Sequence, residues 1–238
     1  MPITVEIISE ASEKLINMVF DYFHKIDERF STYKPNSEIS KVNNGLAKNK
    51  WSKEMKTVFT LCKDTKDITK GYFDIKNGNI FDPSGLVKGW SINNAAELLK
   101  SEGIKNFYIE AGGDIQVYGR TLEGKAWTIG IRNPFNIEEI IKVVELEDQA
   151  IATSGTYIRG QHIYNPHSSD KEITDVKSLS VIASNIYEAD RFATAAFAMG
   201  KDGISFIEEM PGLEGYMVDR DKIATFTSGF ERYAVNNA

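Results

Sequence analysis

The spacing of apolar positions predicts helices in the first part of the chain. Residues 10–30 carry an apolar residue every three or four positions, and the face consists of Leu15, Val19, Phe23, Ile26 and Phe30. A second helix is predicted for residues 53–69, with Ser52 as N-cap and Gly71 as stop. Its inward positions are Met55, Val58, Phe59, Cys62 and Thr65. A third helix is predicted for about residues 89–102, and the polar stretch 31–45 is predicted to be a loop with one short helical turn at most.

Strand patterns dominate after residue 106, and β-branched residues also predict a strand at 3–8. The later strands are expected at 106–111, 114–119, 126–132, 141–147, 149–154, 161–166 and 178–183. A helix over 186–209, broken near Gly200, and a hairpin over 215–227 complete the chain. Helices followed by mostly antiparallel strands indicate an α+β fold. We expect one domain over residues 1–238, which could be divided into two lobes with the site between them.

Composition excludes several classes of protein. The 238 residues are 42% hydrophobic and 26% charged, with a net charge of -6 and no Lys/Arg cluster. This argues against a nucleic-acid partner, which requires a basic surface. Cys62 is the only cysteine, so no internal disulfide can form. No apolar run approaches the ~20 residues of a membrane helix. The chain as it stands is expected to be cytoplasmic, and an exported or lipid-anchored form whose signal was removed is the alternative.

Several segments combine glycine with polar side chains. They are DPSGLVKG (82–89), EAGGD (110–114) and ATSGTYIRG (152–160). Glycine lets the backbone approach a ligand, and free N–H groups can hold phosphate oxygens, although each segment alone is equally well a tight turn. A helix starting near Lys88 would direct its N-terminus at a pyrophosphate. The alternative is an exposed turn that caps the helix. The long segment 71–90 carries aromatic residues throughout, which predicts an ordered loop lining a site.

Two positions could carry metal or acid–base chemistry. Asp190 and Thr194 lie four residues apart on a predicted helix and share a face. Their oxygens suit Mg²⁺, although a plain Asp–Thr pair near a helix start fits as well. His162 could act as an acid or base, or be a structural histidine. Neither His24 nor His167 is given a role. The GxSxG elbow is absent around Ser154, which disfavours a serine hydrolase.

Taken together and in order, seven segments of the chain resemble the ApbE family of FAD:protein FMN transferases. They are DERFSTYKPNSEISKVN (27–43), GYFDI (71–75), DPSGLVKG (82–89), EAGGDI (110–115), ATSGTYIR (152–159), HIYNP (162–166) and EADRFATAAFAMG (188–200). The resemblance implies an ApbE-like, T-fold-related architecture. It also implies that FAD is bound with Mg²⁺ and that FMN is joined by a phosphoester to a Ser or Thr of a target protein. The acceptor would carry a motif such as Ser/Thr-Gly-Ala-Thr.

The resemblance also assigns residues. Tyr33 would lie beside the flavin, and FAD would be bound by Tyr72, Phe73, Asp74, Asp82, Lys88 and Tyr164. The metal would be held by Asp190, Thr194 and the backbone carbonyl of Gly85. His162 would assist the acceptor hydroxyl, and Asp190 is counted with it as catalytic.

The chain departs from the family pattern in three places. Only six residues separate GYFDI from DPSGLVKG, Asn165 stands where many members have Asp, and Ala193 stands where some members carry a second acidic metal ligand. Two other functions use the same residues. One is a metal-dependent FAD pyrophosphatase that releases FMN and AMP to water, and the other is a flavin-binding protein without turnover.

Overall fold

The computed structural model describes residues 1–9, 13–156, 163–168 and 172–235 of the protein. The first half contains β1 (Ile3–Ile7), α1 (Glu13–Phe30), α2 (Glu38–Asn43), the 3-10 helix η1 (Lys48–Lys50), α3 (Lys53–Ile68), β2 (Lys76–Asn77), β3 (Ile80–Phe81), α4 (Ser84–Ser101), β4 (Phe107–Ala111) and β5 (Asp114–Tyr118). The second half contains β6 (Trp127–Asn133), β7 (Asn136–Leu146), β8 (Ala150–Gly155), β9 (Val176–Ala183), α5 (Ile186–Ala198), η2 (Gly200–Asp202), α6 (Gly203–Glu209), β10 (Glu214–Asp219), β11 (Ala224–Phe226) and η3 (Phe230–Arg232).

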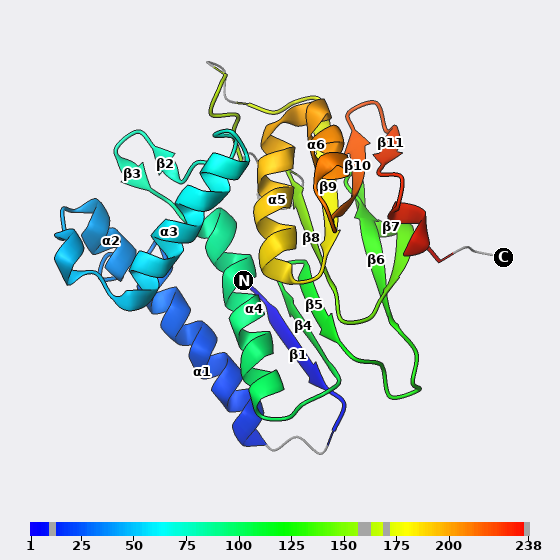
Figure 1. Ribbon diagram of the computed structural model, residues 1–238, viewed down its shortest axis with the longest axis horizontal. Helices are drawn as coiled ribbons and strands as arrows, with labels where there is room; N and C mark the ends of the chain where they lie inside the picture. The colour runs from blue at the N-terminus through cyan, green and yellow to red at the C-terminus, as the bar shows by residue number, and fades with distance from the viewer. Residues whose placement is uncertain (10–12, 157–162, 169–171, 236–238) are drawn as a thin grey trace.

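Within the described residues, seven strands form one sheet in the order β1-β4-β5-β8-β9-β10-β11. Every neighbouring pair is antiparallel. Helices α4, α5 and α6 lie over one face of this sheet, and the hairpin β6–β7 lies behind it (Figure 1). The α+β class with a mostly antiparallel sheet is therefore confirmed.

Both faces of the sheet are covered, which explains why most residues of its central strands β5, β8 and β9 are buried. Ala152 and Val181 belong to the core beneath the helices, together with Phe192 and Phe197 of α5. The alternate positions of the same strands face the β6–β7 hairpin, because successive side chains of a strand point to opposite faces. This second core contains Ile151, Ile182, Val218, Trp127, Ile129, Val144 and Leu146.

A third core joins the N-terminal helices to the start of α4. It includes Ile26 and Phe30 of α1, Met55 and Cys62 of α3, and Trp90 of α4. The predicted inward face of α3 is confirmed for Met55, Val58, Cys62 and Thr65, whereas Phe59 is only half-buried. This core supports the segment between α3 and α4, which carries the short β2–β3 hairpin.

Two expectations from the sequence are wrong. Helix α4 begins at Ser84 rather than near residue 88, so Lys88 and Gly89 lie within its second turn and not at its N-terminus. Pro83 is tolerated there because the start of a helix leaves N–H groups unpaired in any case. Residues 163–166 form no strand. They continue into a turn, in which Ser168 N–H donates to the carbonyl of Asn165 over 3.2 Å, and Pro166 has no N–H for a sheet.

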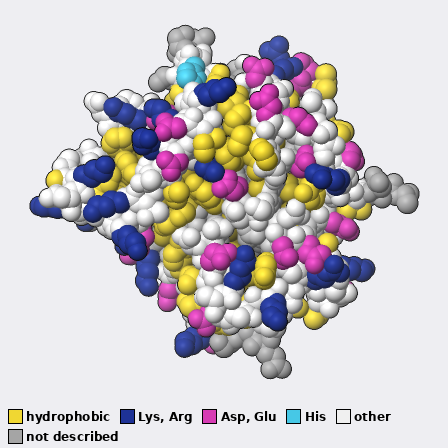
Figure 2. All heavy atoms as spheres, in the orientation of Figure 1, with side chains coloured by type: hydrophobic (Ala, Val, Ile, Leu, Met, Phe, Trp, Pro, Cys, Tyr) yellow, Lys and Arg dark blue, Asp and Glu magenta, His cyan; other side chains and the backbone are white. Residues whose placement is uncertain are grey.

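The break near Gly200 and the turn after Asp219 are confirmed, with φ values of 65° at Gly200 and 66° at Lys222. On the face drawn in Figure 2, acidic and basic side chains are interspersed around a central area of hydrophobic ones. Among the residues that the structure describes, no helix combines the length and hydrophobicity needed to cross a membrane.

Candidate functional site

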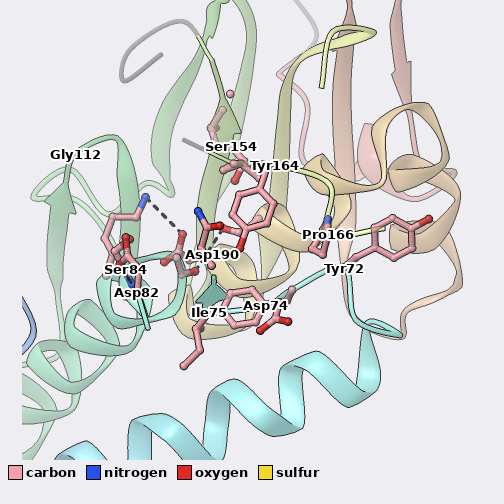
Figure 3. A pocket seen from close by; sticks show the side chains of 18 residues that line it. Tyr72, Asp74, Ile75, Asp82, Ser84, Gly112, Ser154, Tyr164, Pro166 and Asp190 are labelled. Atoms are coloured by element: carbon pink, nitrogen blue, oxygen red, sulfur yellow. Dashed lines mark hydrogen bonds and ion pairs between the residues drawn. The ribbon is translucent and has the colours of Figure 1, made fainter. Parts of the chain in front are cut away.

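A cavity of about 400 Å³ lies between α4, α5, the end of β8 and the segments 72–77 and 163–166. Its wall includes most of the residues proposed for FAD and the metal, namely Tyr72, Phe73, Asp74, Asp82, Gly85, Lys88, Tyr164, Asp190 and Thr194. Figure 3 shows Asp190 in the middle of this group, with Tyr72 and Pro166 to one side and Asp82 and Ser84 to the other. Segments as far as 122 residues apart in the sequence, from Tyr72 to Thr194, therefore converge on one site.

The close approach of α4 to α5 builds the centre of the cavity. A Cβ atom added to Gly89 would lie 2.6 Å from the Cβ of Asp190 and 2.6 Å from the carbonyl oxygen of Ile186. One added to Gly85 would lie 3.2 Å from Cγ2 of Thr194. Glycine at these positions and alanine along α5 let the two helices touch. The contact brings the backbone of α4 within reach of the polar side chains of α5.

The oxygen atoms at this contact fit a hard divalent cation. Asp190 is buried, with 3% of its surface exposed, and its Oδ2 accepts a 2.7 Å hydrogen bond from the N–H of Gly89. Thr194 Oγ1 lies 3.4 Å from the carbonyl oxygen of Gly85. A carboxylate, a hydroxyl and a carbonyl suit Mg²⁺, which takes few protein ligands and keeps sites for water or phosphate. Among the described residues no group of three or more His, Cys, Asp or Glu side chains converges on a possible metal position.

Lys88 reaches this centre from α4 and faces two acids. Its Nζ lies 2.6 Å from Oδ2 of Asp114 and 3.4 Å from Oδ1 of Asp190. Burial raises the pKa of Asp114 well above its usual range, the Lys88 charge opposes that rise, and the nearby Asp190 adds to it. Asp114 was not among the predicted site residues. The signal for it was present in the EAGGD segment, where it follows two glycines.

The mouth of the cavity is held by contacts between segments 70–77 and 163–168. Tyr164 donates its hydroxyl to the carbonyl of Lys76 over 3.3 Å. The His167 ring nitrogen Nε2 lies 3.0 Å from the carbonyl of Lys70, and the ring packs against Tyr72 at 4.6 Å between centroids. His167 is exposed, as expected, yet it contacts the cavity wall. Burial raises the pKa of the Tyr164 hydroxyl, and the charges of Asp74 and Asp82 raise it further.

Two predicted residues are not among the described residues of this wall. Tyr33 follows α1, is 95% exposed and does not line the cavity, so its place beside the flavin stays a prediction. His162 lies outside the described residues. The cavity also contains polar groups that were not predicted singly, including Asn77, Ser84 and the Thr153–Gly155 stretch. This stretch is the end of β8 and lies across the cavity from Asp190.

The ApbE family model matches residues 1–82 and 76–217 of the chain. The FAD:protein FMN transferase of Vibrio cholerae is 30% identical over 179 residues, which cover 71% of this chain and 50% of that protein. The protein of the same name from Treponema pallidum is 28% identical over 170 residues, covering 64% of this chain and 47% of its own length. The chain thus spans about half the length of these curated relatives.

Solved structures show the same fold. The flavin transferase ApbE from Vibrio cholerae superposes with a TM-score of 0.85 at 23% identity, covering 97% of this chain and 95% of that one. The apo form of the Pseudomonas stutzeri flavinyl transferase ApbE gives 0.84 at 20% identity, covering 98% and 94%. At these identities the likeness establishes the architecture alone.

Proposed function

The chain belongs to the ApbE family, and we propose that it transfers the FMN half of FAD to a Ser or Thr hydroxyl of a target protein, in a reaction that depends on Mg²⁺. The observation that carries this proposal is the cavity itself. It unites the residues that the resemblance assigned to FAD and the metal, apart from Tyr33.

The lining of the cavity suits a dinucleotide, in which a charged pyrophosphate joins two halves. Tyr72, Phe73 and Tyr164 supply aromatic surface, which can pack against a flavin ring. Lys88 and the oxygens at the α4–α5 contact supply the charged centre. A site with apolar walls and a few convergent polar groups is the usual form of a small-molecule site.

The transfer requires one phosphorus–oxygen bond to form and one to break. The acceptor hydroxyl oxygen attacks the phosphorus of the FMN half, and the bond from that phosphorus to the bridging oxygen breaks. AMP leaves with the bridging oxygen, and the hydroxyl proton passes to a base. We assign that base to His162, which adjoins the cavity residue Ile163 in sequence.

The protein would supply charge and position in this reaction. Asp190, Thr194 and the Gly85 carbonyl would hold Mg²⁺, which when bound offsets negative charge on the pyrophosphate. Lys88 adds a second positive charge on the same side of the cavity. The Gly89 N–H fixes Oδ2 of Asp190, so the carboxylate keeps one orientation. These contacts prepare the site before the substrate arrives.

The acceptor is proposed to be a flavoprotein subunit or domain carrying a Ser/Thr-Gly-Ala-Thr-like motif. The test is to incubate the protein with FAD, Mg²⁺ and a peptide with this motif, and to detect flavin that stays attached after denaturation. We expect attachment by the wild type and its near loss in Asp190→Asn, with Asp219→Asn as a matched control remote from the cavity. No covalent flavin on any acceptor of this kind would refute the proposal. FAD binding without turnover would favour the non-catalytic alternative.

A further inference from the structure

Two buried carboxylates share the Lys88 ammonium at the centre of the cavity. The side chains of Asp114 and Asp190 are 1% and 4% exposed, and that of Lys88 is 16% exposed. The Lys88 Nζ lies 2.6 Å from Asp114 and 3.4 Å from Asp190. Because the attraction between two charges falls with the inverse of their separation, the closer pair is about 1.3-fold stronger at equal dielectric. Of these two acids, Asp114 therefore attracts Lys88 more strongly.

The two carboxylate oxygens of Asp190 have different partners. Oδ2 accepts the hydrogen bond from Gly89 N–H, on the α4 backbone. Oδ1 is the oxygen that faces Lys88. A cation bound at Asp190 would compete with the ammonium for Oδ1. The position of Lys88 thus decides how accessible that oxygen is.

Asp114 is placed with little freedom. It is the first residue of β5 and pairs directly with Ala111 of β4 across a turn of two glycines. Gly112 and Gly113 have φ values of 61° and 92°, which two-residue hairpin turns of this kind require. Thr153 N–H, on the neighbouring strand β8, lies 3.4 Å from its other oxygen, Oδ1. Within the part of the chain that the structure describes, Oδ2 makes no hydrogen bond of normal geometry, and its contact with Lys88 is an ion pair.

We propose that Asp114 is a positioning residue, which holds Lys88 back on the β5 side so that Oδ1 of Asp190 stays open to a divalent cation. This inference rests on the cation site of the proposed function. Asp114 competes with Asp190 for the ammonium through its shorter contact, 2.6 Å against 3.4 Å. Its burial strengthens the effect, since water screens the pair little.

The test is a double-mutant cycle on cation binding, without FAD and without turnover. Mg²⁺ is titrated into the metal-free wild type, Asp114→Asn, Lys88→Met and the double variant, and the affinities are measured by calorimetry. Asp114→Asn should weaken Mg²⁺ binding about 10-fold, because Lys88 moves onto Asp190. In the Lys88→Met background the same change should weaken binding by no more than about 3-fold, which is the direct effect of losing one nearby charge.

The matched control is Asp219→Asn. Asp219 is also a buried aspartate paired with a lysine, 2.8 Å from Lys201, but it does not line the cavity. This variant should leave Mg²⁺ affinity unchanged. Circular dichroism checks that each variant is folded.

Several outcomes would overturn the inference. Unchanged affinity in Asp114→Asn would do so, and so would an equal loss in both backgrounds, which would mean that the charge acts without moving Lys88. If Asp114→Asn does not fold, Lys88→Met alone decides: it should bind Mg²⁺ at least as tightly as the wild type, and weaker binding would contradict the competition. A wild type that binds no Mg²⁺, with or without FAD, would remove the cation site of the proposed function and this inference with it.

Discussion

Replacing Gly89 with alanine should force α4 and α5 apart at the centre of the cavity. The added Cβ would stand 2.6 Å from both the Asp190 Cβ and the Ile186 carbonyl oxygen, whereas ordinary van der Waals contact begins near 3.4 Å. Both neighbours are held by helix α5, so neither can swing away as the end of a flexible side chain would. The helices must therefore separate by roughly the missing 0.8 Å.

The size of the effect follows from three terms. Overpacking a buried contact costs about 1–3 kcal/mol. Strain on the hydrogen bond from Gly89 N–H to the buried Asp190 carboxylate adds about 1–2 kcal/mol. Alanine regains about 1 kcal/mol, because glycine is a poor helix former. We expect a net loss of about 1–4 kcal/mol in the free energy of unfolding, together with weaker Mg²⁺ binding.

Urea denaturation measures the stability term, and calorimetry with Mg²⁺ measures the binding term. Asn93→Ala, one turn further along α4, is the control for a change in helix propensity alone. Gly85→Ala should fall between the two, because its Cβ would meet the Thr194 methyl group at 3.2 Å and the Phe73 ring at 3.5 Å, which are longer contacts than those at Gly89. A Gly89→Ala protein within about 0.5 kcal/mol of the wild type, with normal Mg²⁺ affinity, would refute the account of the α4–α5 contact.

Three further predictions concern the cation site, pH and the single thiol. Asp190→Ala should lower the initial rate of covalent flavin formation at least about 100-fold with an unchanged circular dichroism spectrum. Thr194→Val should lower it about 10-fold, because only a neutral ligand is lost. Near-full activity in Asp190→Ala would disprove the metal assignment. Hydrogen bonding from Lys201 and from the backbone of residues 221 and 223 lowers the pKa of Asp219, so its stabilising effect is present above its unfolded pKa of about 4 and is lost as the pH falls through the folded value. Asp219→Asn should therefore unfold at a lower urea concentration than the wild type at pH 7, with the gap narrowing as the pH falls below about 4; a gap independent of pH would contradict this. Burial raises the pKa of the Cys62 thiol, so Ellman's reagent at pH 8 should react only after denaturation, and rapid reaction of the folded protein would show that the N-terminal core is open.

The sequence predicted the fold class and most elements because their apolar patterns are local. The start of α4 was misplaced because two glycines, Gly85 and Gly89, lower helix propensity in that stretch. Glycine is required at these positions because α5 packs closely against α4. Helix α5 lies about 100 residues further along the chain, so no local pattern reveals this contact. The absence of a strand before Pro166 likewise depends on contacts with residues 70–77.

The candidate site was predicted mainly through resemblance, and the geometry then brought its residues together. Asp190 and Thr194 could be paired from their helical spacing alone. The place of Asp114 in the site could not be predicted in this way. A buried carboxylate is favourable only with a partner such as Lys88, and the packing of α4 against the β4–β5 turn brings these two residues together. Tyr33 is the opposite case. It lies in a segment that resembles the family, and yet it does not line the cavity.

The measurement that tests the central claim most directly is the ratio of products from FAD. The protein is incubated with FAD, Mg²⁺ and an excess of acceptor, and AMP, free FMN and acceptor-bound flavin are quantified together. Transfer to a protein hydroxyl predicts one acceptor-bound flavin for each AMP, with little free FMN, and loss of both products in Asp190→Asn. AMP and free FMN in equal amounts, with no flavin on the acceptor, would contradict the transferase and identify a pyrophosphatase.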